Sequence, residues 1–212
     1  MKLTLYHQSA LIVQSESGAV VAVDFGQEVP ADTVAAYTPA ATFLSHQHPD
    51  HFHMPHIVSF GAPVYAPNDV LVRFKDFPHR LNTISAGGNV NIGDLSVSAF
   101  DVDHGPNLSA NIDNLGFTFI SGGRRLLFLG DMGAASDIPQ GTWDVVLVPV
   151  GGSKVFDPAE AADYVARIGH NGVVVPIHYH GRADRASGER FRAVAESMCD
   201  VRLLNVGQEL AV

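Results

Sequence analysis

The chain has almost no cysteine, no long apolar run and few basic residues. Cys199 is the only cysteine among 212 residues, which excludes an intrachain disulfide. No segment approaches the roughly 18 consecutive apolar residues of a membrane span, and the N-terminal apolar stretch breaks too early for a signal peptide. Lys and Arg number 13 against 22 Asp and Glu, giving a formal net charge of -9. This charge argues against a partner that is nucleic acid or an anionic membrane, and we expect a cytoplasmic protein.

The bulk composition is that of an ordinary globular protein. Hydrophobic residues make up 46% of the chain and charged residues 17%, which is inconsistent with a disordered chain. No linker or low-complexity tract divides it, so we expect a single domain over residues 1–212. Whether the chain forms a homo-oligomer is left open by the sequence.

Short apolar segments separated by glycine and polar residues predict many strands with a few helices between them. The expected strands are 3–6, 10–14, 19–24, 42–45, 63–66, 81–85, 89–92, 95–102, 116–121, 125–129, 143–150, 172–177 and 201–204. The expected helices are 32–37, 54–60, 67–76, 158–168 and 187–198. Strands interspersed with helices predict an α/β or α+β fold, in which helices cover the sheets.

Histidines and aspartates lie where several of the expected strands end. Four of the six residues in the run His46-Gln47-His48-Pro49-Asp50-His51 are histidine or aspartate. Such residues offer nothing to an apolar core, whereas imidazole and carboxylate are the ligands that zinc and similar metals prefer. Three further candidates follow later strands, and they are His104, Asp131 and His178. The sequence therefore predicts a metal site built from strand ends.

The spacing within the run predicts two neighbouring ion sites. In an extended segment residues i and i+2 point the same way, so His46 and His48 can bind one ion together, with His104 as the third histidine. A turn at Pro49 would direct Asp50 and His51 toward a second position, where His178 joins them. Asp131 could bridge the two ions with its two oxygens. Two ions about 3.5–4 Å apart can share a hydroxide that attacks a substrate. Asp50 would orient this hydroxide.

These motifs resemble the metallo-β-lactamase superfamily of metal-dependent hydrolases over essentially the whole chain. The H-x-H-x-D-H run, the later histidine, Gly130-Asp131 and the final histidine occur in that family's order. The opening residues 6–12, the stretch 148–152 and the ending 176–179 resemble the group that includes ascorbate-6-phosphate lactonases and a phospholipase D acting on acylated phosphatidylethanolamine. The resemblance implies a four-layer αββα sandwich with a dinuclear site at one edge. It implies the same seven ligands, with zinc expected and manganese or iron also accepted.

The chain departs from the family pattern at some positions. Pro49 and residues 52–54 replace the small residues that usually surround the motif. In the G-H-[SA] opening, His7 is the match for the histidine, but Gln8 takes that place if the alignment shifts by one residue.

Several other residues are candidates for catalysis or substrate binding. His180 follows His178 by two positions and could donate a proton to the leaving group, and His7 could reach the site from the first hairpin. For both, a structural role competes with the catalytic one. Three basic residues follow ligand-bearing strands: Lys154, Arg182 and Arg185. They could bind a phosphate or carboxylate of the substrate. The simpler alternative is that they are ordinary surface residues.

The leading hypothesis is a hydrolase of a small ester-like substrate, such as a lactone or phosphorylated sugar lactone. Two bound divalent ions would add about four positive charges at the site, so an anionic substrate stays possible despite the acidic chain. The first alternative is a phosphodiesterase acting on a cyclic nucleotide or phospholipid headgroup. A second alternative, of another class, is a metal-binding module without catalysis.

Overall fold

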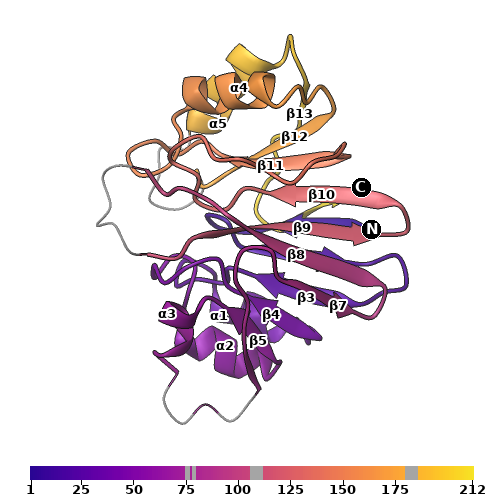
Figure 1. Cartoon of the computed structure of the whole chain (residues 1–212), viewed down its shortest axis with the longest axis vertical. Coiled ribbons are helices and arrows are strands. Elements are labelled where there is room, and N and C mark those ends of the chain that lie inside the picture. Colours follow the sequence, from indigo (N-terminus) through magenta and orange to yellow (C-terminus); the bar gives the residue numbers. More distant parts are fainter. Residues whose placement is uncertain (75–76, 78–79, 106–111, 180–185) are drawn as a thin grey trace.

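Two sheets of seven strands each form the centre of the molecule (Figure 1). The computed structural model describes residues 1–74, 77, 80–105, 112–179 and 186–212. The first sheet has the order β14-β1-β2-β3-β4-β5-β6 and the second β13-β12-β11-β10-β9-β8-β7. Strands of the first sheet are β1 (Lys2–Leu5), β2 (Leu11–Gln14), β3 (Val20–Val23), β4 (Ala41–Phe43), β5 (Val64–Ala66), β6 (Leu81–Thr83) and β14 (Gln208–Ala211). Strands of the second are β7 (Asn89–Ile92), β8 (Leu95–Asp101), β9 (Leu115–Ser121), β10 (Arg124–Phe128), β11 (Val145–Pro149), β12 (Val173–Ile177) and β13 (Asp200–Val201).

Helices cover the outer face of each sheet, which gives four layers. Figure 1 shows α4 (Pro158–Arg167) and α5 (Ala186–Ala195) on the second sheet. On the first sheet lie α1 (Ala31–Ala35), α2 (Met54–Phe60) and α3 (Asn68–Leu71). The predicted start of α4 is confirmed: the Asp157 side chain accepts hydrogen bonds from the backbone N–H groups of Ala159 and Glu160, and the Glu160 carboxylate accepts one from the Asp157 N–H.

The largest apolar cluster lies between the two sheets. It contains residues from β1 to β4 of one sheet and from β8 to β12 of the other. Phe43 of β4 contacts Phe117 of β9 edge-on, with ring centroids 5.7 Å apart. Both side chains are fully buried, and burial of each contributes about 2 kcal/mol to stability. Because both sheets bury this face, neither can slide by one residue without exposing its apolar side chains.

The strand directions bring several chain segments to one edge of the sandwich. Strands β3, β4 and β5 are parallel, and β10, β11 and β12 are parallel. Strand β8 runs in the same direction as β10, since each pairs antiparallel with β9. The segments that follow β4, β8, β10 and β12 contain the predicted ligands.

The expected elements differ from the observed ones at a few places. The helix predicted over 67–76 is too long: α3 ends at Leu71, and residues 75 and 76 lie outside the described part of the chain. The last predicted strand, 201–204, is reduced to Asp200–Val201. Strand β14 was not predicted, because its residues Gln208–Ala211 are mostly exposed and show no apolar alternation.

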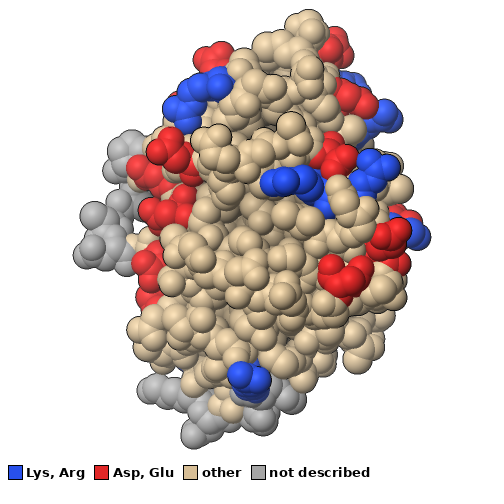
Figure 2. All heavy atoms as spheres, turned by 45° about the vertical axis from the view of Figure 1, so that its right-hand side comes forward, with Lys and Arg blue, Asp and Glu red and all other residues tan. Residues whose placement is uncertain are grey.

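The surface has mixed charge on the face drawn in Figure 2. Basic side chains there stand singly or in small groups beside acidic ones, without a continuous basic area. Among the described residues, no helix combines the length and apolar character needed to cross a membrane.

Candidate metal centre

The seven predicted ligands meet at the shared edge of the two sheets. His46 lies three residues after the end of β4, His104 three after β8 and Asp131 three after β10, whereas His178 directly follows β12. Residues 46–51 form one loop, in which the His51 N–H donates to the His48 carbonyl at 3.0 Å. Strand ends that are 132 positions apart in sequence thus supply one site.

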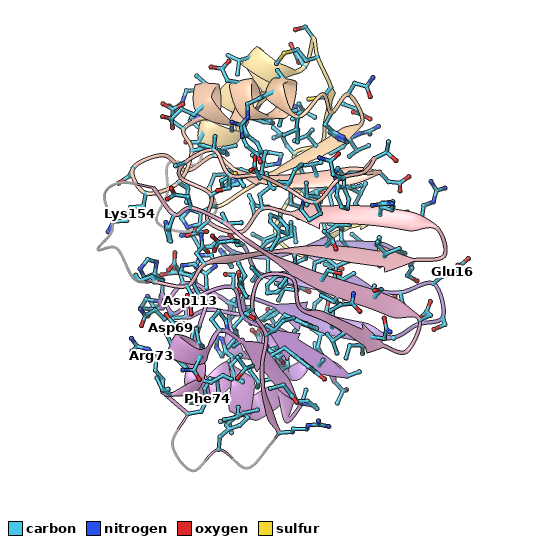
Figure 3. The ribbon with its side chains drawn as sticks, in the orientation of Figure 1. Glu16, Asp69, Arg73, Phe74, Asp113 and Lys154 are labelled. Carbon is cyan, nitrogen blue, oxygen red and sulfur yellow. The ribbon has the colours of Figure 1, made fainter. Side chains whose placement is uncertain are left out.

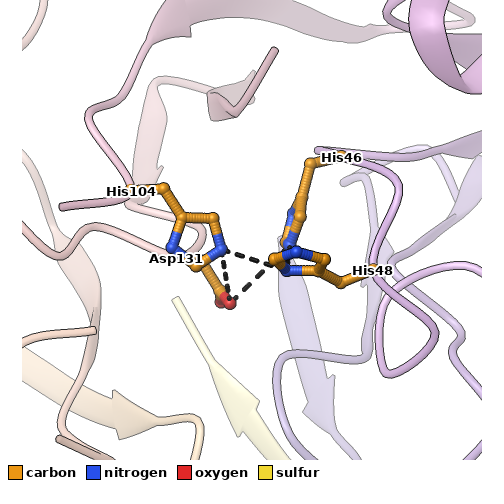
Figure 4. A group of neighbouring side chains, drawn as sticks. All are labelled: His46, His48, His104 and Asp131. Carbon is orange, nitrogen blue, oxygen red and sulfur yellow. Dashed lines mark hydrogen bonds and ion pairs between the residues drawn. The ribbon is translucent and has the colours of Figure 1, made fainter. Parts of the chain in front are cut away.

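The first group of candidate ligands consists of His46, His48 and His104, and Figure 4 shows it converging with Asp131. Nε2 of His46 lies 2.9 Å from Nδ1 of His48, and Nε2 of His104 lies 3.2 Å from the same nitrogen. Ligands of a four-coordinate zinc lie roughly 3.4 Å apart, given bonds of about 2.1 Å. The spacing therefore suits one small ion.

The second group consists of Asp50, His51 and His178, whose ligand atoms all lie within 4.8 Å of one another. Oδ2 of Asp50 is 3.4 Å from Nε2 of His178 and 3.8 Å from Nε2 of His51. His51 is fully buried, while the Asp50 side chain is 26% exposed. This group thus combines a closed interior with one carboxylate open to solvent.

Asp131 lies between the two groups. Its Oδ2 is 3.1 Å from Nε2 of His51 and 3.2 Å from Nε2 of His178 in the second group. The same oxygen is 3.5 Å from Nε2 of His104 and 3.8 Å from Nε2 of His46 in the first. One carboxylate oxygen thus faces both groups, as a ligand shared by two ions would.

Unpaired buried atoms provide a test of whether ions suit this site. Nε2 of His51, Nε2 of His178 and Oδ1 of Asp131 are buried without a hydrogen-bond partner among the described residues. The short approaches to Oδ2 of Asp131 lack hydrogen-bond geometry. Buried polar atoms without partners are costly, and a divalent ion would satisfy them together. The donor set of imidazole and carboxylate suits zinc, manganese or iron.

Asp24, which was not predicted, supports one histidine of each group. It follows β3, is fully buried and has a left-handed φ of 51°. Its Oδ2 lies 2.9 Å from Nδ1 of His51 and accepts a 2.6 Å hydrogen bond from the Ser45 hydroxyl. Oγ of Ser45 is in turn 2.9 Å from Nδ1 of His46. Both imidazoles are thus held so that Nε2 faces the centre.

The carboxylates divide the histidines into neutral and protonated ones when no ion is bound. Burial, followed by the nearby His51, places the pKa of His46 well below its usual range. Burial also disfavours the charged form of His178, but Asp131 and Asp50 outweigh it and raise the pKa to about 9. In the same way Asp131 and Asp24 overcome burial and raise the pKa of His51 well above its usual range. An ion entering the second group must therefore displace protons.

A cavity of about 460 Å³ opens onto the centre. Its lining includes His48, Asp50, His104, Asp131 and His178. Further lining residues are Gln8, Gln27, Glu28, Pro49 and residues 151–154. A volume of this size suits a small molecule.

The other predicted residues lie at different distances from this cavity. Lys154 lines it and projects from the edge of the molecule opposite Glu16 (Figure 3). The Lys154 carbonyl is 3.1 Å from Nδ1 of His104, which orients that ring. His7 is half-buried and is not a lining residue, whereas its neighbour Gln8 is. His180, Arg182 and Arg185 lie outside the described residues.

Comparison with known proteins agrees with this architecture. Residues 2–178 match the model of the β-lactamase superfamily domain. The chain belongs to this family. A UPF0173 protein of Pyrococcus furiosus is 28% identical over 197 residues, covering 91% of this chain and 89% of that protein. A UPF0173 metal-dependent hydrolase of Myxococcus xanthus is 27% identical, covering 89% of this chain and 76% of that protein.

Solved structures show the same fold at lower identity. The metallo hydrolase Igni18 of Ignicoccus hospitalis superposes with a TM-score of 0.79 at 20% identity, covering 99% of this chain and 97% of that one. The predicted metallo-β-lactamase fold, a sandwich of two mixed sheets and helices, is confirmed for this β-lactamase superfamily member.

Proposed function

We propose that this protein is a dinuclear metal-dependent hydrolase of a small ester-like substrate, such as a lactone or a phosphorylated sugar lactone. The coarse class, a metal-dependent hydrolase of the β-lactamase superfamily, follows from the family and from the names of its relatives. The lactone is proposed from the sequence resemblance to lactonases, which is an argument by analogy.

The observation that carries the proposal is the position of Asp131. Its Oδ2 is within 3.8 Å of imidazole nitrogens from both ligand groups, beside a cavity large enough for a small substrate. Divalent ions held by these residues would supply a lowered water pKa and polarisation of an ester carbonyl. A site that only stabilises the fold would be closed on all sides, whereas Asp50 and His48 line an open cavity.

The residues on the cavity have separate roles in this proposal. Burial opposes ionisation of Asp50, but His178 and His51 outweigh it and hold the pKa of its carboxyl below the usual range. Asp50 is therefore a carboxylate at neutral pH, able to accept a hydrogen bond from the attacking water and orient it. Lys154 would bind a carboxylate or phosphate on an anionic substrate. His180 and His7 stay candidates for the general acid.

The test is a substrate panel for the protein loaded with zinc or manganese. Lactones should be hydrolysed, while thioesters and aryl phosphodiesters should react slowly or not at all. Asp131→Ala and His48→Ala should abolish turnover with the circular dichroism spectrum retained. Asp163→Ala, which removes an exposed carboxylate on α4, should leave turnover unchanged. Phosphodiester hydrolysis without lactone hydrolysis would replace the proposed substrate class, and loss of the fold in both ligand variants would favour a structural metal.

A further inference from the structure

Gln8 occupies a strained position in the turn between β1 and β2, at the edge that carries the metal centre. Its φ is 57°, in the left-handed region that residues with a side chain rarely adopt. The side chain lines the cavity, and the residue is only 4% exposed. Strain of this kind persists where the surrounding structure enforces it, and it is concentrated at functional sites.

The contacts of Gln8 are with two members of the second group. Its main-chain carbonyl accepts a 2.9 Å hydrogen bond from the N–H of His178. Its side-chain Nε2 donates to Oδ2 of Asp50 over 3.5 Å, a long hydrogen bond. A carboxylate can only accept, so the amide nitrogen of Gln8 must face Asp50. Oε1 then faces away, and it is buried without a partner among the described residues.

His178 needs such support more than His46, His51 and His104 do. Nδ1 of His46, His51 and His104 lies 2.9 to 3.1 Å from an oxygen of Ser45, Asp24 or Lys154, which orients each ring. Nδ1 of His178 is buried and has no partner in the described part of the chain.

The direction of the His178 ring therefore depends on its main chain and its packing. The backbone has a left-handed φ of 60° and is bonded to Gln8. A Cβ added at Gly151 would lie 3.0 Å from Nδ1 of the ring. The main chain of His178 is thus held by the Gln8 turn, and its ring packs close to the bare backbone of Gly151.

We propose that Gln8 is the positioning residue of the second group. Its carbonyl fixes the backbone of His178, and its side-chain amide fixes the direction of the Asp50 carboxylate. Gln8 thereby determines how tightly an ion is held by Asp50, His51 and His178, while the first group is independent of it. This inference rests on the proposed metal centre, and it gives Gln8 a role that His7 does not share.

The test measures ion binding and stability of the whole metal-free chain. Zinc affinity is obtained by titration calorimetry, and cobalt is followed by its visible absorption, for the wild type, Gln8→Gly, Gln8→Leu and Gln8→His. Gln27→Leu is the matched control, because Gln27 lines the same cavity but its side chain makes no hydrogen bond to either ligand group among the described residues. Thermal unfolding is recorded for each variant.

We expect Gln8→Gly and Gln8→Leu to reduce the affinity for the second ion by about 10-fold or more. The affinity for the first ion should be unchanged. Gln8→His restores an N–H donor and should recover much of the loss. Gln8→Gly should keep or raise Tm, because glycine adopts a left-handed φ without strain. The Gln27→Leu protein should bind both ions as the wild type does.

Two results would overturn the role of Gln8. One is unchanged affinity for the second ion in Gln8→Gly and Gln8→Leu. The other is equal weakening of both ions together with a lower Tm, which indicates a merely structural residue. A wild-type chain that binds fewer than two ions would refute the proposed centre itself, so the two failures can be told apart.

Discussion

Replacement of Asp24 by asparagine should reduce the affinity of the protein for both metal ions at once. Asn has the shape of Asp and tolerates a left-handed φ, so the backbone at φ 51° should be preserved. Oδ1 of residue 24 must keep accepting from the Ser45 N–H at 2.7 Å. The new NH₂ group then faces Nδ1 of His51 and the hydroxyl of Ser45. Two donors oppose each other at His51, and the Ser45 hydroxyl loses its acceptor.

The magnitude follows from the outer contacts of metal-bound histidines. Loss of such a contact reduces metal affinity by about 10- to 100-fold, or about 1.4 to 2.7 kcal/mol. His51 is affected directly and His46 through Ser45, so each ion should lose affinity within this range. Competition with a chromophoric chelator measures both constants, and kcat/KM on a lactone should fall in parallel.

A Ser45→Ala variant provides the matched control. It removes the link to His46 at 2.9 Å but leaves the contact between Asp24 and His51 intact. Only the first ion should be weakened. If Asp24→Asn binds both ions with wild-type affinity, or if Ser45→Ala weakens the second ion alone, the reasoning about Asp24 is refuted.

Three further predictions concern pH, packing and the opposite edge. The pKa of His178 is raised from 6.5 to about 9, so its contribution to the stability of the metal-free chain is full below pH 6.5 and lost as pH rises through 9. The free energy of unfolding in urea should fall by about 3 kcal/mol over that range, and bound zinc should abolish the fall; a flat profile without zinc would contradict this. Gly151→Ala places a Cβ 2.2 Å from the His178 carbonyl oxygen and should displace His178. Calorimetry should therefore show that the second ion binds at least about 10-fold more weakly, and wild-type affinity for that ion would contradict this reasoning. Asp94 accepts hydrogen bonds from Ser15, Ser17 and Ser121. Asp94→Asn should therefore lower Tm and leave zinc affinity unchanged, and a changed zinc affinity would contradict this prediction.

The convergence of the seven candidate ligands could be predicted from sequence because their chemistry is concentrated and their positions are regular. The four histidine and aspartate residues within residues 46–51 offer nothing to an apolar core, and strands with buried runs locate the other three candidates. His46 and His178 lie together because of the directions of the strands that precede them. The apolar pattern of the sequence predicted both of these strands. Helix α2 (Met54–Phe60) and strand β7 (Asn89–Ile92) have the predicted bounds.

The supporting residues could not be predicted in the same way. Asp24 is one aspartate at a strand end, and most such carboxylates are solvated; only its neighbours in three dimensions reveal that it is fully buried. Gln8, and not His7, lines the cavity, and Gln8 has a left-handed φ, which periodicity does not report. Strand β14 is mostly exposed, so no apolar pattern indicated it. Single-domain organisation, the native metal and the role of His180 stay predictions.

The most direct test of the metal centre is a crystal structure of the zinc-loaded protein, with anomalous scattering at the zinc edge and elemental analysis of the same sample. We expect two zinc ions per chain, one contacted by His46, His48 and His104 and the other by Asp50, His51 and His178, with Asp131 touching both. A single ion, or two ions with His178 turned away from them, would contradict the account.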